Sequence, residues 1–296
     1  LFDLGFRRVS FGVQDYNLKV QQAIHRVQPF EHVKRVTELA REIGYTSVGH
    51  DIIFGLPFQT ESDVINTITK TEVLMPDRIA FYSYANVPWI KGNGQRSFKD
   101  EDLPSPDSKH YQYATGKRLL EKANYIEIGM DHFALKSDSL YKAVHHGTLH
   151  RNFMGYTAAK TQFMIGLGAS SVSDSWYGFT QNVKSIEEYY HLIDEGIIPV
   201  YRGHILNTEE LVIRKHILNL MCYFRTSWLN PEMTFAELSE VLLKLKEFEL
   251  DGLLELERKQ VIVTEKGKPF IRNICMAFDL LLHRKKPDTK LFSMTI

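Results

Sequence analysis

The stretch Val48-Gly49-His50-Asp51-Ile52-Ile53-Phe54, followed by Gly55-Leu56-Pro57, predicts a largely apolar strand that ends at a turn. Before this strand, residues 32–43 carry apolar side chains with the period of an amphipathic helix. After it, Thr60 is expected to cap a helix, with Asp63 three positions later near the positive end of the helix dipole. A strand between two helices is typical of βα units, whose strands form a parallel sheet.

The same alternation extends through the first half of the chain. Further strands are expected at 6–13, 78–85, 126–130 and 163–172, and further helices at 18–24 and 109–123. The polar connection from Asn86 to Asp107 is longer than a simple link needs to be, so we expect it to serve the binding face. The pattern predicts an α/β domain over residues 1–196.

The pattern changes from about Ile197. A helix is expected over 208–221, and Thr234 is expected to cap another that runs through Glu247. Residues 252–264 predict a hairpin with its turn at 257–259, and a final helix is expected to continue through Leu282. Two helices, a two-stranded wing and a helix resemble a winged-helix module, so residues 197–296 are expected to form a smaller α+β domain.

Composition limits the classes of partner. The chain has 296 residues, of which 44% are apolar and 24% charged, as in ordinary globular proteins. Lys plus Arg and Asp plus Glu both number 36, so no global field attracts nucleic acid or an anionic membrane. The sequence shows no membrane-span pattern and no signal peptide, and Cys222 and Cys275 are too few for a disulfide framework. We expect a cytoplasmic monomer that binds neither nucleic acid nor membrane.

Two clusters of polar side chains follow apolar residues in the middle of the chain. They lie in Gly129-Met130-Asp131-His132-Phe133-Ala134 and in His150-Arg151-Asn152-Phe153-Met154-Gly155-Tyr156-Thr157. Strands that end in such groups usually place them at the mouth of a sheet or barrel, where ligands bind. A metal site at Asp131 and His132 is conceivable, but an Asp-His pair alone is weak support for one.

Five separated motifs occur in an order that resembles the oxygen-independent coproporphyrinogen III oxidases, radical S-adenosylmethionine (SAM) enzymes of haem synthesis. They are residues 13–17 (Val-Gln-Asp-Tyr-Asn), 51–57, 129–134, 150–157 and 272–276 (Arg-Asn-Ile-Cys-Met). The resemblance runs from Leu1 to the last residue. It implies that residues 1–196 are the C-terminal part of a radical-SAM partial (βα) barrel.

The resemblance also implies two cofactors, SAM and a [4Fe–4S] cluster. The family ligates the cluster with three cysteines in a C-x-x-x-C-x-x-C loop, and this sequence has no such loop. The chain begins at Leu1, not Met, and residues 6–13 are already typical of an interior strand. We therefore expect it to be the C-terminal part of a longer protein, whose missing part ligates the cluster.

Three residues are implied as SAM contacts by their place in the motifs. Asp51 lies inside an apolar strand, where a carboxylate needs a partner or a donor-rich ligand, although a capping or salt-bridged role remains open. The resemblance makes Asp51 a contact to the SAM ribose or amine, Gln14 a SAM-binding glutamine, and Arg26 a carboxylate or ribose binder. Without the resemblance, Arg26 would be read as a solvated surface side chain.

Two small or apolar positions complete the implied cofactor site. Ala85 matches a family position whose backbone approaches SAM, and Val172 matches an apolar residue that packs on it. Core packing explains the neighbouring Tyr82 and Tyr84 equally well. The glycine-rich stretch 166–172 lacks the GxGxxG spacing, so a dinucleotide site is rejected, and its small residues instead suggest a backbone close to a ligand.

Arg151 and Asn152 are candidate substrate contacts. The family's substrate is a macrocycle with four propionates, so Arg151 and neighbouring donors are plausible carboxylate clamps. A purely structural role for Arg151 stays open. Relatives that act as haem chaperones usually carry a His-Asn-x-x-Tyr-Trp signature here, so His150-Arg151-Asn152-Phe153 favours the oxidase.

The resemblance implies a radical reaction in the intact protein. An electron donor would reduce the cluster, the cluster would reduce SAM, and the resulting 5′-deoxyadenosyl radical would abstract hydrogen from a propionate. Loss of carbon dioxide and one electron leaves a vinyl group, twice per coproporphyrinogen III, to give protoporphyrinogen IX. This chain alone is expected to be inactive, and its catalytic residues stay unassigned.

Two other functions would each need a specific feature of the sequence. A haem-binding chaperone would need an axial ligand, for which His132 or Cys275 could be invoked. A nucleic-acid module would need a basic recognition helix, but residues 234–247 carry three glutamates and only two lysines. The charge of this expected helix therefore argues against a nucleic-acid-binding module.

Overall fold

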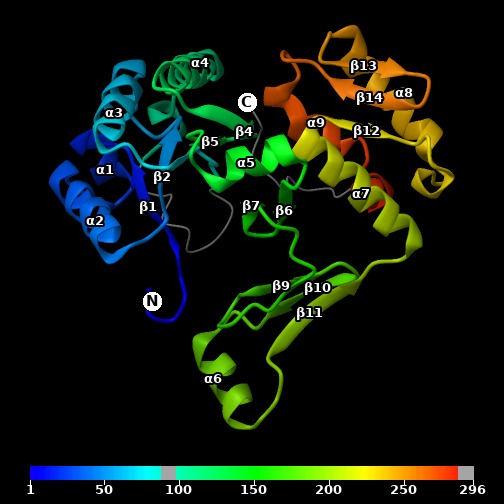
Figure 1. Cartoon of the computed structure of the whole chain (residues 1–296), viewed down its shortest axis with the longest axis horizontal. Helices are drawn as coiled ribbons and strands as arrows, with labels where there is room; N and C mark the ends of the chain where they lie inside the picture. The colour runs from blue at the N-terminus through cyan, green and yellow to red at the C-terminus, as the bar shows by residue number, and fades with distance from the viewer. Residues whose placement is uncertain (88–97, 286–296) are drawn as a thin grey trace. The chain divides into compact units, whose positions relative to one another are not determined.

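The computed structural model describes residues 1–87 and 98–285 (Figure 1). Contacts divide the described chain into two compact units, residues 1–142 and 143–285. The boundary expected at 196/197 falls inside the second unit, between α6 (Ile186–Asp194) and β11 (Val200–Ile205). The division into domains at that point stays a prediction.

The first unit contains a five-stranded sheet in the order β1-β2-β3-β5-β4. Three strands are parallel, namely β1 (Arg8–Gln14), β2 (Ser47–Phe54) and β3 (Arg78–Ser83). The helices that connect them are α1 (Leu18–Ala23), α2 (Phe30–Ile43) and α3 (Glu61–Leu74), and Thr60 caps α3 with Asp63 in a capping box. The predicted βα units are confirmed for these three strands. The strands of the described ranges do not close into a barrel.

The remaining two strands of this sheet form a hairpin. β4 (Ile126–Gly129) and β5 (His132–Ala134) pair antiparallel, and β5 pairs antiparallel with β3. Residues 126–129 form the expected strand and run in the same direction as β3, but they do not pair with it, because Met130 takes a left-handed φ of 44° and turns the chain back, so that β5 lies antiparallel between β3 and β4. Asp131 lies at this turn, after a strand that runs in the direction of β3, and His132 begins the antiparallel β5.

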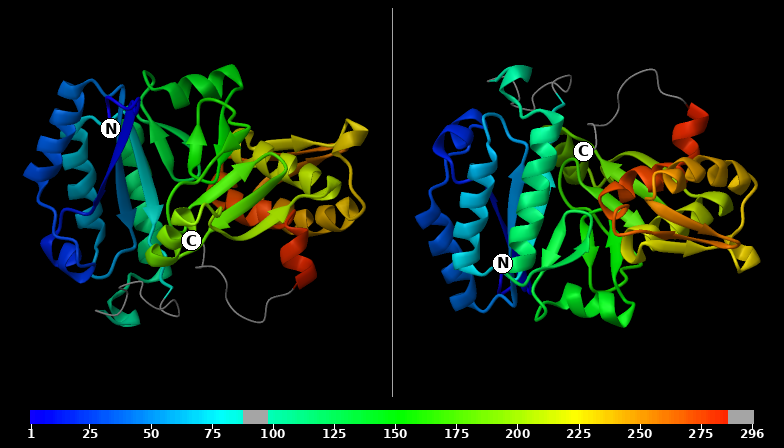
Figure 2. Two further views of the ribbon diagram at one scale, coloured as in Figure 1. Left: turned by 90° about the horizontal axis from the view of Figure 1, so that it is seen from below. Right: turned by 90° about the horizontal axis from the view of Figure 1, so that it is seen from above.

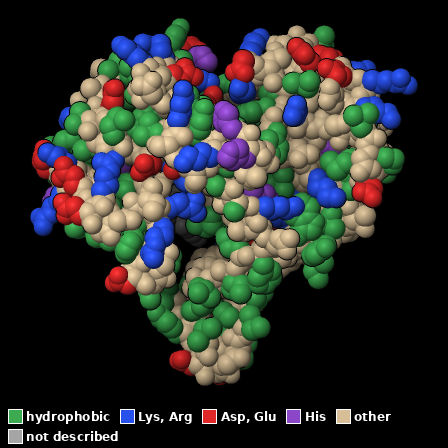
Figure 3. Space-filling view, viewed as in Figure 1, with side chains coloured by type: hydrophobic (Ala, Val, Ile, Leu, Met, Phe, Trp, Pro, Cys, Tyr) green, Lys and Arg blue, Asp and Glu red, His purple; other side chains and the backbone are tan. Residues whose placement is uncertain are grey.

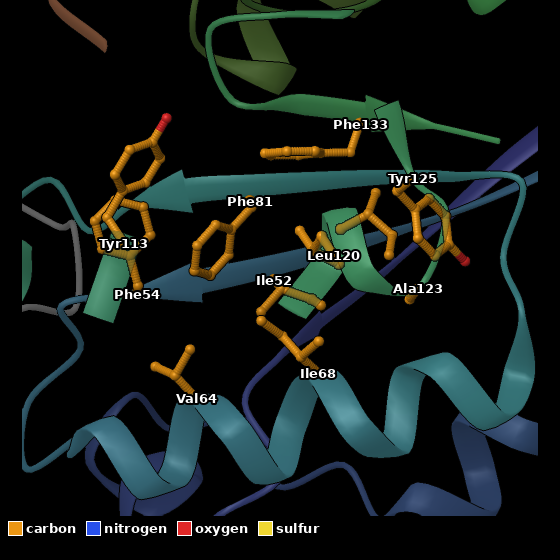
Figure 4. Close-up of a cluster of buried hydrophobic side chains, with 11 residues drawn as sticks. Ile52, Phe54, Val64, Ile68, Phe81, Tyr113, Leu120, Ala123, Tyr125 and Phe133 are labelled. Atoms are coloured by element: carbon orange, nitrogen blue, oxygen red, sulfur yellow. The ribbon is translucent and has the colours of Figure 1, made fainter. Parts of the chain in front are cut away.

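Helices cover one face of the sheet. Figures 1 and 2 show α2 and α3 side by side over it, and α4 (Pro106–Lys122) adds to the cover. Alternate residues of β2 and β3 point into this layer and meet apolar side chains of α3 and α4 (Figure 4). The resulting buried cluster includes Ile52, Phe54, Val64, Ile68, Phe81, Tyr113, Leu120 and Phe133. Gly116 lets α4 approach closely, because a Cβ atom there would lie 2.4 Å from the Phe81 ring.

The second unit begins within α5 (Ser139–His146) and continues with the hairpin β6 (His150–Asn152) and β7 (Gly155–Thr157). A four-stranded antiparallel sheet follows in the order β11-β10-β9-β8, built from β8 (Phe163–Met164), β9 (Val172–Ser175), β10 (Gly178–Asn182) and β11. Every residue of β11 is exposed, and Figure 3 shows hydrophobic side chains gathered over the lobe of β9–β11 and α6.

The single strand expected over residues 163–172 is wrong. Two short strands stand at its ends, and the stretch between them is irregular, because Gly168 and Ser170 take left-handed φ values of 98° and 64°. A Cβ atom at Gly166 would lie 2.7 Å from the carbonyl oxygen of Val172. Backbone packing within this segment therefore accounts for the glycine.

The last hundred residues contain helices and a three-stranded sheet in the order β12-β14-β13. The strands are β12 (Arg225–Ser227), β13 (Leu254–Glu257) and β14 (Gln260–Val263); the helices are α7 (Thr208–Tyr223), η2 (Pro231–Met233), α8 (Leu238–Leu250), η3 (Lys268–Phe270), α9 (Ile271–Met276) and α10 (Leu280–Lys285). The predicted hairpin over 252–264 is confirmed. No helix within 1–87 or 98–285 is long and apolar enough to cross a membrane.

Two helix boundaries predicted in this segment are wrong. Thr234 does not cap α8, because its hydroxyl donates 2.6 Å to the carbonyl of Pro231, the first residue of η2, and α8 starts at Leu238. The single final helix expected from the sequence is instead two helices: α9 ends at Met276 and α10 begins at Leu280. There Phe278 is fully buried, and the side chain of Asp279 accepts 2.9 Å from the Leu282 amide to start α10.

Candidate functional site

The face of the parallel sheet opposite the helices carries small and polar side chains. The strand register pairs Gly12 with Asp51, Asp51 with Ala80, and Ala80 with His132. Paired residues point to the same face, so these four form a row across the sheet, which we call the polar row. The strand alternation that sends Ile52 and Phe81 into the helical core places the polar row on the opposite face.

Asp51 is the half-buried carboxylate of this row. Its Oδ1 atom accepts 2.8 Å from the Ser10 hydroxyl on β1. Burial raises the pKa of Asp51, while the Ser10 hydrogen bond and the charge of Arg26 act to lower it. A carboxylate offers about four acceptor positions, so Asp51 keeps capacity for a ligand with donor groups.

Gln14 and Arg26 come together beside Gly12. A Cβ atom on Gly12 would lie 2.8 Å from both Nη2 of Arg26 and Nε2 of Gln14. Gly12 therefore provides the space that both side chains occupy. The Oε1 atom of Gln14 is buried and has no hydrogen-bond partner among the described residues. A buried acceptor without a partner is costly, so a ligand that donates a hydrogen bond there would relieve the cost.

The structure thus brings together three of the predicted cofactor contacts: Gln14, Arg26 and Asp51. Ala85 follows the end of β3, and like Gln14 it stands at the carboxyl end of a parallel strand. Val172 is the first residue of β9 in the second unit. The roles of Ala85 and Val172 as cofactor contacts stay predictions.

An aromatic pair extends the polar row. Tyr82 lies two residues beyond Ala80 on the same face, and its ring meets the His132 ring edge-on, with 5.6 Å between centroids. The Tyr82 hydroxyl is 3.4 Å from Nε2 of His132. Tyr82 therefore belongs to the polar face and not to the helical core.

Sequence reasoning missed Ser10 and Gly12. A signal was present, because a strand that runs through residues 6–13 places residues 10 and 12 on one face. The sequence does not determine the register between β1 and β2, which sets Ser10 beside Gly49 and Gly12 beside Asp51.

Arg151 and Asn152 line a cavity of about 350 Å³ within the second unit. Its walls are mostly apolar side chains, among them Phe153, Phe179, Ile213, Ile217, Met221 and Leu280. The Arg151 guanidinium lies 4.9 Å over the Tyr156 ring, and its Nη1 atom is buried without a partner among the described residues. Arg151 therefore has a donor available for a ligand's carboxylate.

Asn152 is less available than Arg151. Its Nδ2 donates 3.2 Å to the Thr161 hydroxyl, and its Oδ1 accepts 2.9 Å from the Met154 amide. Asp131 and His132 belong to the first unit and Arg151 and Asn152 to the second. The expectation that each cluster lies at the mouth of a sheet or barrel, where ligands bind, stays a prediction.

The two cysteines are buried and protonated. Burial raises the pKa of the Cys222 and Cys275 thiols to about 12 each, against a smaller opposing effect of the Arg151 charge. Residues 1–87 and 98–285 contain no group of three or more His, Cys, Asp or Glu side chains arranged to hold a metal ion. An iron–sulfur cluster needs several thiolates, so the described residues do not fit one.

The chain is similar to proteins of known families. Residues 1–70 match the family model of the radical SAM superfamily. The chain is 40% identical to the oxygen-independent coproporphyrinogen III oxidase of Helicobacter pylori (strain J99) over 301 aligned positions, which cover 100% of this chain and 65% of the relative. It is 39% identical to the enzyme of that name from Escherichia coli (strain K12), over 99% of this chain and 65% of the relative.

A solved structure is similar to nearly the whole chain. Coproporphyrinogen III oxidase from Escherichia coli, described as a radical SAM enzyme, superposes with a TM-score of 0.89 at 38% identity. The match covers 95% of this chain and 66% of the solved chain. The chain thus spans slightly less than two thirds of the length of the proteins it matches.

Proposed function

Because this chain belongs to the family of the oxygen-independent coproporphyrinogen III oxidases, we propose that it is part of a radical SAM oxidoreductase of haem synthesis. The whole protein would decarboxylate two propionate side chains of coproporphyrinogen III to vinyl groups and so give protoporphyrinogen IX. One observation carries this proposal: Gln14, Arg26 and Asp51 converge on one face of the sheet. They do so within the 70 residues that match the superfamily model.

The donor and acceptor set of this face fits SAM. SAM presents a carboxylate, an ammonium group and ribose hydroxyls. Arg26 offers forked donors to the carboxylate, while Asp51 and the unpartnered Oε1 of Gln14 accept from the ammonium or the hydroxyls. Ala85 and Val172 would add a close backbone approach and an apolar contact.

When bound, SAM would supply the radical chemistry, and the residues of this chain would bind and orient it. Gly12 makes room beside the sheet for Arg26 and Gln14, and Asp51 and Arg26 carry the opposite charges that a zwitterionic ligand requires.

The iron–sulfur cluster would be ligated by residues outside this chain. Cys222 and Cys275 are too few for the three-cysteine loop of the family, and their buried thiols are protonated at neutral pH. The whole protein would hold the cluster and receive electrons from an external donor. It would do so in the cytoplasm.

Arg151 is the proposed contact for a substrate propionate. It offers an unpartnered buried donor at the edge of an apolar cavity, and a guanidinium binds a carboxylate through two parallel hydrogen bonds. Asn152 would act beside it. Of the two axial ligands that a haem chaperone could use, His132 and Cys275, the cysteine is buried and its pKa is raised to about 12.

Anaerobic turnover by the full-length protein tests the proposal. The protein with its cluster reconstituted is given coproporphyrinogen III, SAM and a reductant, and porphyrinogens and carbon dioxide are measured. The expected result is protoporphyrinogen IX with two molecules of carbon dioxide per substrate. Stoichiometric haem binding in a spectral titration, without decarboxylation, would instead support the chaperone.

A further inference from the structure

Three buried glutamine side chains connect the backbone segments around the candidate cofactor site. Gln21, Gln59 and Gln112 have exposed fractions of 3%, 4% and 0%. Each uses both ends of its amide in hydrogen bonds within the first unit. Buried amides that are fully bonded fix their neighbours, because breaking any one bond leaves a buried polar group unsatisfied.

Gln14 needs such support. It has a left-handed φ of 64°, and the Asp15 amide donates 2.9 Å back to the Val13 carbonyl, so Gln14 is the centre of a three-residue turn. A side chain other than glycine is disfavoured in this conformation. The surroundings must therefore hold the turn in place.

Gln21 ties this turn to the loop that carries Arg26. Its Nε2 atom donates to the carbonyls of Asp15 and Gln28, both at 2.8 Å, and its Oε1 accepts 3.1 Å from the Gln28 amide. Its backbone carbonyl accepts 2.9 Å from the Arg26 amide. The Gln28 side chain then accepts 3.3 Å from Nε of Arg26.

Gln59 holds the same turn from the other side. Its Nε2 donates 2.7 Å to the buried Asp15 carboxylate and 2.8 Å to the Ile53 carbonyl at the end of β2. Gln112 on α4 donates 2.9 Å to the Gln59 carbonyl. Gln59 and Gln112 thus hold this side of the Gln14 turn. Of the three buried glutamines, only Gln21 contacts the loop that carries Arg26.

We propose that Gln21 is a positioning residue for cofactor binding, because it fixes Gln14 and Arg26 together through its bridge between Asp15 and Gln28. The inference rests on the proposed function. Arg26 itself is exposed and lies in a loop between α1 and α2, so its guanidinium depends on this bridge for its place beside Gly12.

The test uses the full-length protein with its cluster. Gln21→Met keeps the size of the side chain and removes both ends of the amide. Gln22→Met is the matched control, since Gln22 is the next residue of α1 and is exposed. Gln21→Met should weaken SAM binding roughly tenfold, as expected for losing a buried amide's bonds, with cluster content unchanged. Gln22→Met should bind SAM as the wild type does.

A double-mutant cycle separates positioning from a general loss of stability. If Gln21 acts through Arg26, Gln21→Met should have a much smaller effect on SAM affinity in an Arg26→Ala background. Equal effects in both backgrounds would overturn the inference. Unchanged SAM affinity in Arg26→Ala and Asp51→Ala would instead contradict the proposed function itself, so the two failures are distinguishable.

A second variant covers the case in which Gln21→Met does not fold. Gln28→Ala removes only a half-buried side chain and leaves the backbone bonds to Gln21. It should weaken SAM binding several-fold, because Arg26 loses its acceptor. If Gln21→Met does not fold, an unchanged SAM affinity in Gln28→Ala would overturn the inference.

Discussion

Gly12 and Arg26 are packed so closely that a Cβ atom on Gly12 would lie 2.8 Å from Nη2 of the arginine. The same atom would lie 2.8 Å from Nε2 of Gln14. Because residue 12 has no side chain, Gln14 and Arg26 can both lie against it. Gly12 is also the strand position that pairs with Asp51.

Gly12→Ala should weaken SAM binding in the full-length protein without unfolding it. The new methyl group meets only the ends of two flexible side chains, so Arg26 and Gln14 move and the sheet does not. We expect a loss of affinity of about tenfold, the scale of one hydrogen bond to a charged group. Equilibrium dialysis with SAM measures it. In an Arg26→Ala background the effect should shrink, and a full effect there would contradict the account.

His50 should make the first unit less stable in acid. It is fully buried, its Nε2 is 2.9 Å from the Thr37 hydroxyl, and burial with the nearby Arg41 charge lowers its pKa to about 4. The unfolded chain binds a proton near pH 6.5, so the native state holds fewer protons between those values. Stability therefore falls as the pH drops from about 6.5 to about 4, by up to about 3 kcal/mol.

His50→Gln should flatten this dependence, because glutamine does not titrate. Urea unfolding at pH 7 and pH 5 measures it, with His32→Gln on the exposed face of α2 as the control. An unchanged pH dependence in His50→Gln would show that other groups govern the acid sensitivity.

This chain by itself should not bind a stoichiometric [4Fe–4S] cluster. Its two thiols are buried, and both have a pKa raised to about 12, so neither is a thiolate at neutral pH. Anaerobic reconstitution with iron and sulfide, followed by absorbance spectroscopy and iron analysis, checks this. Both thiols should react slowly with a thiol reagent until the chain is unfolded. A full cluster that disappears in Cys222→Ser or Cys275→Ser would refute the prediction.

Arg151→Lys should raise the KM for coproporphyrinogen III in the full-length enzyme by about tenfold and leave SAM affinity unchanged. Lysine keeps the charge but loses the forked donors that hold a carboxylate in two parallel bonds. Arg258→Lys, in the turn between β13 and β14, is the matched control. A fall in stability with an unchanged KM would show that Arg151 is structural.

The sequence predicted the strands whose alternation is strong. β1, β2 and β3 each place apolar residues on one face and small or polar residues on the other, so their existence and parallel pairing followed from pattern alone. The failures among the strands occur where the backbone takes a left-handed φ, at Met130 and Ser170 without a sequence signal and at Gly168 within the glycine-rich stretch. Met130 turns residues 126–134 into a hairpin, and Gly168 with Ser170 splits the strand expected over 163–172.

The candidate site was predictable only in part. Gln14, Arg26 and Asp51 were selected by their place in family motifs, and Asp51 also by its place within an apolar strand. Arg26 lies in a loop, and no local pattern brings it to β1. Its position depends on the space at Gly12 and on the bridge through Gln21, which are tertiary contacts between residues several positions apart.

SAM binding to the full-length protein, wild type against Asp51→Ala, tests most directly whether the polar row is the cofactor site. Asp51 is a half-buried carboxylate in the row, with one hydrogen bond from Ser10 and the Arg26 charge nearby. A hydrogen bond to a charged group contributes about 1.5–3 kcal/mol, so affinity should fall by about one to two orders of magnitude with cluster content intact. Glu42→Ala on the exposed face of α2 should change nothing. Equal SAM affinity in the wild type and Asp51→Ala would contradict the account.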